Sequence, residues 1–181
     1  MDGHESRACD TMRSPLGEML IAVTGDTLDG LWFLEQKHFP AARGWRRVSG
    51  HPVMRATRLQ IDAYFAGELH EFSVPLAPRG NVFQEQVWQA LLTIPYGELR
   101  TYGDIAVQLG LPRSHARAVG SAVGRNPVSI IVPCHRVIGQ TGALTGYAGG
   151  LDRKRGLLAL ERQGMGGERP GFELVGETAG G

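Results

Sequence analysis

The sequence predicts a mixed α/β (α+β) fold: a small N-terminal α/β domain, followed by a mainly helical C-terminal domain with a helix-turn-helix and an active-site cysteine. Three observations lead to this prediction. Two apolar runs joined by a turn lie near the N-terminus, a proline-rich stretch interrupts the chain near residue 78, and capped helical patterns follow it. We therefore expect a structural domain over residues 1–78, a second domain over 79–163, and a disordered, glycine-rich tail over 164–181.

Composition sets the class of protein. The chain has 181 residues, 42% of them hydrophobic, which is enough for one ample core or two small domains. The N-terminus lacks the apolar run of a signal peptide and no stretch is long enough to span a membrane, so we expect a cytoplasmic or nucleoid protein. Residues 81–163 carry nine Lys and Arg against five Asp and Glu, which favours contact with phosphates only weakly. Cys9 and Cys134 are expected to be free thiols.

In the first domain, the apolar runs Met19–Val23 and Leu28–Leu34 flank Gly25-Asp26, a pattern typical of a β-hairpin. A helix is predicted from about Arg55 to Ala66, with Gly67 as its stop signal. Its apolar positions at helical spacing are Leu59, Ala63 and either Tyr64 or Phe65. The stretch 74–80 contains two prolines, which lack the amide donor of a helix, so we place the domain boundary there.

Three helices are predicted after this linker. Asn81 and Gln84 resemble a capping box ahead of the first helix, and Thr101 and Asp104 resemble another ahead of the second. The apolar stripe of the first helix consists of Phe83, Val87, Trp88, Leu91 and Leu92. The second helix ends at 110–112, where the sequence reads Gly-Leu-Pro, and a third follows from about Ser114 to Val123. The last two helices have the outline of a helix-turn-helix.

The third helix is built mainly of alanine, glycine and serine. Small side chains let the backbone of a helix approach another surface closely. This composition suits insertion into a narrow groove, and it suits tight packing against a neighbouring helix equally well.

The segment Ile130–Gly139 carries the chemistry. An apolar, β-prone stretch leads into Cys134, His135 and Arg136, so we expect a strand to deliver the cysteine. A free thiol is mostly protonated at neutral pH, and a neighbouring base or cation favours its thiolate. Because adjacent residues of an extended chain point to opposite sides, His135 would need a bridging water or a sharp turn to act on the sulfur. Taken alone, the pair fits a buried, inert cysteine beside a structural histidine equally well.

The motif Pro133-Cys134-His135-Arg136-Val137 resembles the active-site motif of the O6-alkylguanine-DNA alkyltransferases, also called methylated-DNA-protein-cysteine methyltransferases. The resemblance extends over residues 14–162. Its further segments are Ser14–Gly17, Tyr64–Gly67, Ile94–Glu98, Arg117–Gly120, Asn126-Pro127, Leu144–Gly150 and Leu157-Leu158 before Glu161.

The resemblance implies catalytic roles for five residues. Cys134 is the nucleophile that accepts the alkyl group, His135 is the base that acts on it through water, and Glu161 is the carboxylate that orients the imidazole. Tyr102 contacts a phosphate while the base rotates and can donate a proton to the departing O6. Asn126 holds the turn between the third helix and the active-site strand.

The resemblance also implies DNA and substrate contacts. Arg117 fills the gap that the rotated nucleotide leaves in the base stack. The other expected DNA contacts on the same helix are Ala116, Ala118, Gly120 and Ser121. The residues expected to line the base pocket are Tyr147, Ala148, Gly149, Val137 at its floor, and Val123.

The implied function is repair of double-stranded DNA by direct reversal. An alkyl group would pass from O6-alkylguanine, and from O4-alkylthymine, to Cys134 in a single irreversible turnover without any cofactor. We expect a monomer that binds the minor groove, and we leave cooperative binding along DNA open. Some relatives bind zinc in the first domain, but this chain has Thr24 and Asp29 in the corresponding region, so no metal is expected.

One departure and two alternative functions accompany the resemblance. Between Pro112 and Arg117 the chain has one residue more than is usual in the family, so the start of the third helix is not fixed by it. One alternative is a non-catalytic protein that recognises alkylated bases, but relatives of that kind carry tryptophan at the position of Cys134. The other is a cysteine hydrolase of small acyl substrates, which would need an oxyanion hole and would turn over many times.

Overall fold

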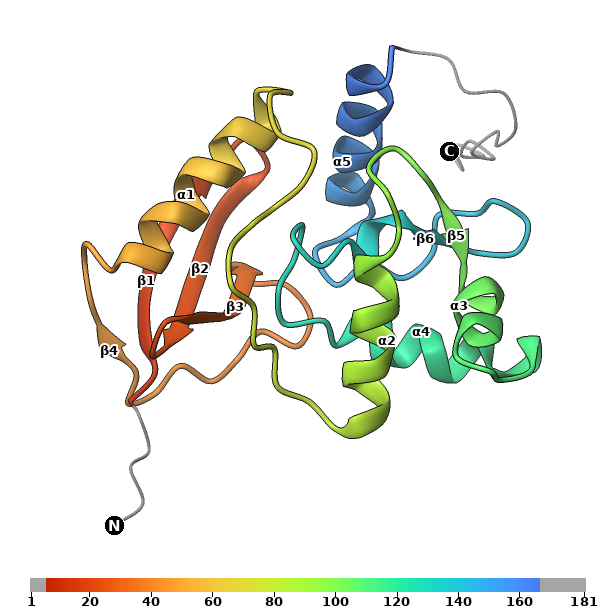
Figure 1. Cartoon of the computed structure of the whole chain (residues 1–181), viewed down its shortest axis with the longest axis horizontal. Helices are drawn as coiled ribbons and strands as arrows, with labels where there is room; N and C mark the ends of the chain where they lie inside the picture. The colour runs from red at the N-terminus through yellow and green to blue at the C-terminus, as the bar shows by residue number, and fades with distance from the viewer. Residues whose placement is uncertain (1–5, 167–181) are drawn as a thin grey trace, which may run out of the picture.

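The computed structural model describes residues 6–166, which form an N-terminal sheet with one helix and a C-terminal group of helices (Figure 1). The sheet has the order β3-β2-β1-β4. Its strands are β1 (Ala8–Ser14), β2 (Gly17–Thr24), β3 (Thr27–Phe33) and β4 (Arg46–Arg47). Strand β2 pairs antiparallel with both β1 and β3, and β4 lies parallel to β1. The predicted mixed α+β class is confirmed.

The predicted hairpin is β2 and β3, which turn at Gly25 with a positive φ of 55°. Strand β1 was missed by sequence analysis. Only Ala8 and Met12 of its residues are buried, so the strand shows little of the apolar alternation that identifies a strand.

Helix α1 (Pro52–Phe65) packs on the sheet and begins three residues before the predicted Arg55. Proline is favoured in the first turn of a helix, and the His51 ring caps this one by accepting a hydrogen bond from the Val53 amide at 3.1 Å. The predicted apolar face was wrong at Leu59, which is 70% exposed. The residues of α1 that are buried are Val53, Met54, Thr57, Ile61 and Tyr64.

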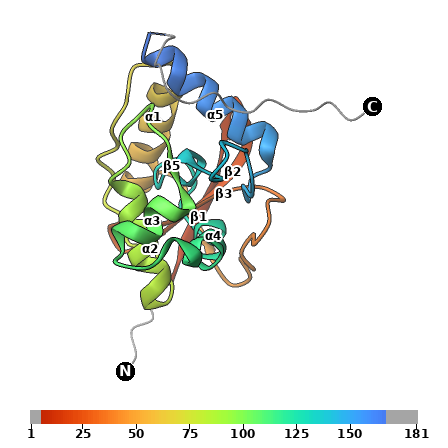
Figure 2. The same cartoon turned by 90° about the vertical axis from the view of Figure 1, so that its right-hand side faces the viewer.

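Both predicted capping boxes are present in the second half of the chain. The helices there are α2 (Val82–Leu92), α3 (Tyr102–Gln108), α4 (Ala116–Gly124) and α5 (Leu151–Gly164), and the short strands β5 (Arg100–Thr101) and β6 (Val137–Ile138) pair in parallel. The helix predicted from Ser114 starts at Ala116, because Arg113–His115 form a 3-10 turn. Helices α3 and α4 form the expected helix-turn-helix. The turned view shows α2, α3 and α4 gathered together, with α5 above them (Figure 2).

Two expectations need correction. The chain does not reach Cys134 through a strand: residues 129–131 form a turn, and Cys134–Arg136 form a 3-10 helix. The predicted tail begins too early, because Gly164 is the last residue of α5. The rest of that predicted tail, residues 167–181, lies outside the described residues, as do residues 1–5.

Two later segments, one from the linker and one after α4, extend the hydrogen bonding of the sheet beyond β3. Leu28 donates to the Pro75 carbonyl at 2.8 Å and accepts from the Ala77 amide at 2.9 Å. Further along, Leu31 donates to the Pro127 carbonyl at 2.8 Å and accepts from the Ser129 amide at 2.9 Å. The linker and the segment before Cys134 therefore both dock on the same strand.

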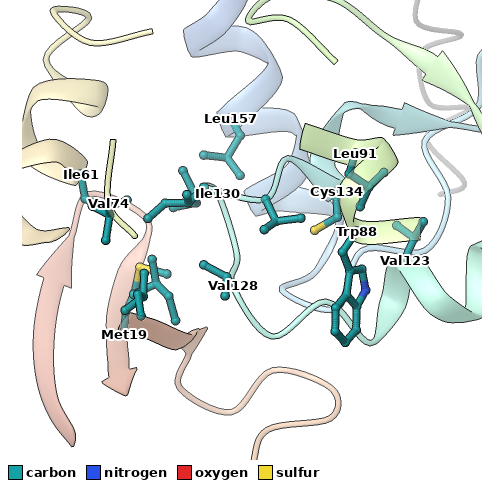
Figure 3. Packing of buried hydrophobic residues seen from close by; sticks show 14 of the residues in the cluster. Met19, Ile61, Val74, Trp88, Leu91, Val123, Val128, Ile130, Cys134 and Leu157 are labelled. Carbon is teal, nitrogen blue, oxygen red and sulfur yellow. The ribbon is translucent and has the colours of Figure 1, made fainter. Parts of the chain in front are cut away.

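The main hydrophobic core runs without interruption through both halves of the molecule. Met19, Ile61 and Val74 lie on one side, Trp88, Leu91 and Cys134 on the other, and Val128 and Ile130 lie between them (Figure 3). Cys134 is thus part of the core packing. Among residues 6–166, every helix is too short or too polar to cross a membrane.

Candidate active site

The turn that carries Cys134 is built around the Asn126 side chain, which is buried directly after α4. Its Oδ1 accepts from the Val128 amide at 2.9 Å, and its Nδ2 donates to the Val132 carbonyl at 2.9 Å. The same Nδ2 lies 3.1 Å from the Cys134 sulfur. One amide side chain therefore supplies the hydrogen bonds that a neighbouring strand would otherwise provide, and it places a donor on the thiol. The turn explains why the apolar run 128–132 is not a strand.

Cys134 is 6% exposed, so its thiol sits at the inner end of the turn rather than on the surface. Burial raises the pKa of the thiol, and the hydrogen bond from Asn126 and the positive charge of Lys154 oppose that rise without cancelling it. The thiol is therefore protonated at rest and needs a base to become a nucleophile.

His135 is the neighbouring base and is fully buried. Its Nε2 lies 2.5 Å from Glu161 Oε2. Burial lowers the pKa of His135, and the Glu161 carboxylate offsets only part of that shift, so the ring is neutral at neutral pH. An ionised carboxylate can only accept, so Nε2 carries the proton and Nδ1 is the acceptor. Nδ1 is buried and has no hydrogen-bond partner among residues 6–166.

Glu161 comes from α5 and is 1% exposed. Arg136 donates to it through Nε at 2.7 Å and Nη2 at 3.3 Å, and the Gly97 amide donates at 3.1 Å. Tyr64 of α1 adds its hydroxyl at 2.6 Å. Burial alone would raise the pKa of Glu161, but the hydrogen bonds and charges of His135 and Arg136 outweigh it and hold that pKa far below its ordinary value. The carboxylate is ionised at every pH near neutrality.

Sequence analysis gave Tyr64 no role in the site: it named Tyr64 or Phe65 as an apolar position of the helix and Tyr64–Gly67 as a segment of the resemblance. The structure adds the bond of Tyr64 to Glu161. Its hydroxyl contacts neither Cys134 nor His135 through any hydrogen bond of the described residues. The helical period left either Tyr64 or Phe65 on the buried face, and a buried tyrosine hydroxyl usually has a hydrogen-bond partner. That rule was the one signal in the sequence for a hydrogen bond of Tyr64, and it does not identify Glu161 as the acceptor.

Lys154 was also missed. It is fully buried on α5, where its Nζ donates to the Val137 carbonyl at 2.5 Å and to the Thr145 carbonyl at 3.0 Å. Burial lowers the pKa of Lys154 from 10.5 to about 8. In the sequence, Lys154 sits between two arginines and looks like part of a solvated surface. Its spacing was the signal, because Lys154 precedes Leu157 by three residues and Glu161 by seven, which places all three on one helical face.

Tyr102 begins α3 and stands over the loop that follows β6. Its hydroxyl donates to the Thr145 carbonyl at 2.9 Å, the same oxygen that accepts from Lys154. Burial raises the pKa of Tyr102, so its hydroxyl keeps its proton at neutral pH. The tyrosine is therefore available as a proton donor.

The loop from β6 to α5 contains the residues predicted to wall the base pocket. Tyr147 and Gly149 are buried, and Ala148 is half-buried. A Cβ atom on Gly149 would lie 2.7 Å from the Tyr147 ring and 3.1 Å from Phe33 of β3, so only glycine fits there. Val137 and Val123 are both buried in the core. The assignment of these five residues to a base pocket stays a prediction.

Helix α4 turns its small residues outward. Arg117, Ala118 and Ser121 are exposed and Ala116 and Gly120 are half-buried. The inner face of α4 is formed by Val119, Ala122 and Val123. Both explanations of the small residues therefore hold in part: Ala122 packs inward and Gly120 lies against Tyr102 of α3, whereas Ala118 and Ser121 face outward.

The region expected to lack zinc contains an ion pair. Asp29 is buried and accepts from Thr24 Oγ1 at 2.7 Å and from Arg7 Nε at 3.0 Å. In the part of the chain that the structure describes, no three His, Cys, Asp or Glu side chains are grouped as metal ligands.

A buried thiol next to a histidine–carboxylate pair, under a helix-turn-helix with an open face, defines a class: proteins that join a cysteine nucleophile to a nucleic-acid-binding motif. Comparison with known families makes this specific. The family model for the 6-O-methylguanine DNA methyltransferase ribonuclease-like domain matches residues 8–78, and the one for the DNA binding domain matches residues 82–163. The chain belongs to the 6-O-methylguanine DNA methyltransferase family.

Individual members of this family are similar to the chain over most of its length. The methylated-DNA–protein-cysteine methyltransferase of Mycobacterium leprae is 53% identical over 154 residues, which are 85% of this chain and 92% of the relative. That of Methanosarcina barkeri is 48% identical over 157 residues, 86% of this chain and 98% of the relative. A crystal structure of Mycobacterium tuberculosis OGT in complex with DNA has a TM-score of 0.83 and 52% identity, and it covers 87% of this chain and 94% of its own.

Proposed function

We propose that this protein repairs alkylated DNA by direct reversal, moving an alkyl group from O6 of guanine onto Cys134, with each molecule used once. The observation that carries the proposal is a buried set of four side chains: Asn126, Cys134 and His135 around one turn after α4, and Glu161, which α5 adds to them. The printed names of the relatives, methylated-DNA–protein-cysteine methyltransferases, support the same reaction.

The chemistry follows from the geometry. The thiol proton passes through a water molecule to Nδ1 of His135, and Glu161 stabilises the resulting imidazolium. The thiolate attacks the alkyl carbon in line with the C–O6 bond, so an S–C bond forms while the electron pair of the C–O bond leaves with O6. Tyr102 donates a proton to O6, which avoids release of a full anion, and recovers a proton from the imidazolium or solvent.

Single use follows from the product. The thioether on Cys134 is neutral, and a thiolate is not displaced from its alkyl carbon by water at neutral pH. O4-alkylthymine presents the same alkyl-oxygen bond, so we propose it as a second substrate.

DNA binding is proposed to use the outer face of α4. Its small residues allow the helix backbone to come close to the floor of the minor groove, and Arg117 projects from the same face to replace the rotated nucleotide. The contacting residues are Ala116, Arg117, Ala118, Gly120 and Ser121, with Tyr102 on a phosphate. The rotated base would lie against Tyr147, Ala148, Gly149, Val137 and Val123. A structure of the Mycobacterium tuberculosis relative with DNA supports DNA as the partner.

We propose a division of labour along the chain, with residues 1–78 as a structural domain and 79–163 as the alkyltransferase and DNA-binding domain. The family models, which meet between residues 78 and 82, support this boundary. Tyr64 is the one side chain of the first domain that is hydrogen-bonded to the proposed relay within the described structure. A monomer in the cytoplasm, associated with the nucleoid, completes the proposal.

The direct test is the intact mass after incubation with excess duplex containing O6-methylguanine. We expect a gain of one methyl group, mapped to Cys134 by peptide analysis, after which the protein is inert. Cys9→Ser is the matched control because it removes the other thiol of the chain and should methylate fully. Methylation at Cys9, or product in excess of the protein, would contradict the proposal; the second result would instead favour a hydrolase.

A further inference from the structure

Lys154 presents an electrostatic anomaly. Lysine is almost never fully buried unless a counter-ion accompanies it, yet Lys154 is 0% exposed, and no carboxylate of residues 6–166 lies within ion-pair distance of it. Within the described part of the chain, its hydrogen bonds go to two backbone carbonyls, those of Val137 and Thr145. Carbonyl dipoles orient an ammonium group but do not neutralise its charge.

The surrounding groups leave this charge uncompensated. Glu161 is already neutralised by Arg136, which binds it through two nitrogens, and burial keeps His135 neutral. Tyr102 and Tyr147 face the same region, and burial raises the pKa of both, so they carry no negative charge. Of the positive neighbours on α5, half-buried Arg153 turns away to the carbonyls of Leu16 and Gly149. Among the buried side chains of the site, the net charge is therefore +1 at rest.

The one group whose ionisation would balance this charge is the Cys134 thiol. Val137 directly follows the 3-10 helix Cys134–Arg136, so the ammonium is bonded to the backbone next to the segment that carries the sulfur. The charge of Lys154 acts on the thiol, and a thiolate in turn stabilises the ammonium. A fixed positive charge that has no counter-ion in the ground state stabilises an anion when it forms. Such an interaction lowers the barrier, because it is stronger in the transition state than in the ground state.

We propose that Lys154 is a positioning residue for alkyl transfer, whose buried ammonium group is held in place by the Val137 and Thr145 carbonyls to serve as the counter-charge of the Cys134 thiolate. The inference rests on the proposed function. Histidine takes the thiol proton and Lys154 stabilises the anion that remains, so the two residues act on different products of the same ionisation.

The test separates charge from hydrogen bonding. Lys154→Gln removes the charge and keeps an amide donor for the carbonyls, Lys154→Met removes both, and Lys154→Arg keeps the charge. Lys37→Met is the matched control, since Lys37 is the only other lysine of the chain and is exposed. The free O6-methylguanine base is the substrate, so that loss of DNA affinity does not enter the rate. The apparent pKa of Cys134 is taken from the pH dependence of the single-turnover rate and from thiolate absorbance.

We expect Gln and Met to raise the apparent thiol pKa by about one unit or more and to slow transfer at neutral pH by about tenfold or more. Arg and the Lys37 control should keep the thiol pKa of the unmodified protein. A merely structural role would lower thermal stability without moving the thiol pKa. Removal of an uncompensated buried charge by Gln should leave thermal stability unchanged or higher.

The inference is overturned if Lys154→Gln leaves the thiol pKa unchanged, or if only Met raises it, because then the hydrogen bonds matter and the charge does not. If the Gln variant does not fold, Lys154→Arg decides: a raised thiol pKa in that variant also overturns the inference. Failure of the proposed function looks different, since then the unmodified protein would transfer no alkyl group to Cys134 at all.

Discussion

Replacing Tyr64 by phenylalanine tests whether the first domain stabilises the relay. The substitution removes one hydroxyl that donates to the buried, ionised Glu161 at 2.6 Å, and it leaves the ring in its packing against Phe65 and Phe72. A hydrogen bond to a charged group contributes about 1.5–3 kcal/mol, so the free energy of unfolding should fall by roughly 2 kcal/mol. His135, Arg136 and the Gly97 amide still hold the carboxylate, so the transfer rate of the folded protein should fall much less than when Glu161 itself is replaced.

Tyr96→Phe is the matched control for this prediction. Tyr96 lies beside Tyr64, with ring centroids 6.1 Å apart, but its buried hydroxyl has no hydrogen-bond partner among the described residues. Removing that hydroxyl should leave stability unchanged or increase it, because no bond is lost and a desolvated polar group is removed. Urea unfolding of the two variants and the parent measures the difference. Equal effects in the two variants would refute the assignment of a stabilising bond to Tyr64.

Three further predictions address the rest of the site. Arg117→Ala should slow repair of duplex DNA far more than attack on the free base, because only the duplex must be opened; equal losses in single-turnover assays would place Arg117 in chemistry or folding. Glu161→Gln should raise the pKa of Cys134, slow transfer and cost about 3–5 kcal/mol in urea unfolding, because it leaves a buried guanidinium unpaired. The pKa of Glu161 is held below its ordinary 4.5, so its contribution to stability is present above pH 4.5 and is lost as the pH falls below it; the Gln variant should lack this acid dependence in pH-resolved unfolding. Gly149→Ala should reduce stability and transfer together, since the added Cβ meets the Tyr147 ring at 2.7 Å; calorimetry showing a stable variant would mean that the loop moves freely.

Local patterns allowed prediction of those elements whose structure depends on local sequence. Both capping boxes, the β2–β3 hairpin and the helix-turn-helix were predicted because a cap or a turn is decided by residues three or four positions apart. Strand β1 was not predicted although it joins β2 through a turn of only two residues, because few of its side chains are buried and apolar alternation is weak. Its pairing with β4 joins segments that are far apart in the sequence. The prediction that Leu59 is buried was wrong because the helical period shows only which residues share a face, and tertiary packing decides which face is buried.

The residues of the candidate site were likewise predictable only where the signal lies in the local sequence. The Cys134 motif and Glu161 were assigned by resemblance, but the expected strand at Cys134 was wrong because the Asn126 side chain satisfies the backbone locally. Lys154 and Tyr64 entered only with the structure, because each acts on the site through a partner far away in sequence: Tyr64 lies 97 positions from Glu161. Lysine side chains usually lie on the surface, and the sequence does not show that the Val137 and Thr145 carbonyls bind Lys154 in the interior.

The bonds that Leu28 and Leu31 make with residues 75–77 and 127–129 also protect the molecule from self-association. Strand β3 lies at the outer side of the sheet, and an unpaired strand of this apolar kind would offer its amides and carbonyls to the same strand of another copy. Here the linker and the segment before Cys134 occupy those groups. A fragment that ends before residue 75 would lose the hydrogen bonds that cover the edge of β3 as well as its core partners. We expect it to aggregate through β3 at concentrations where the intact chain stays in solution.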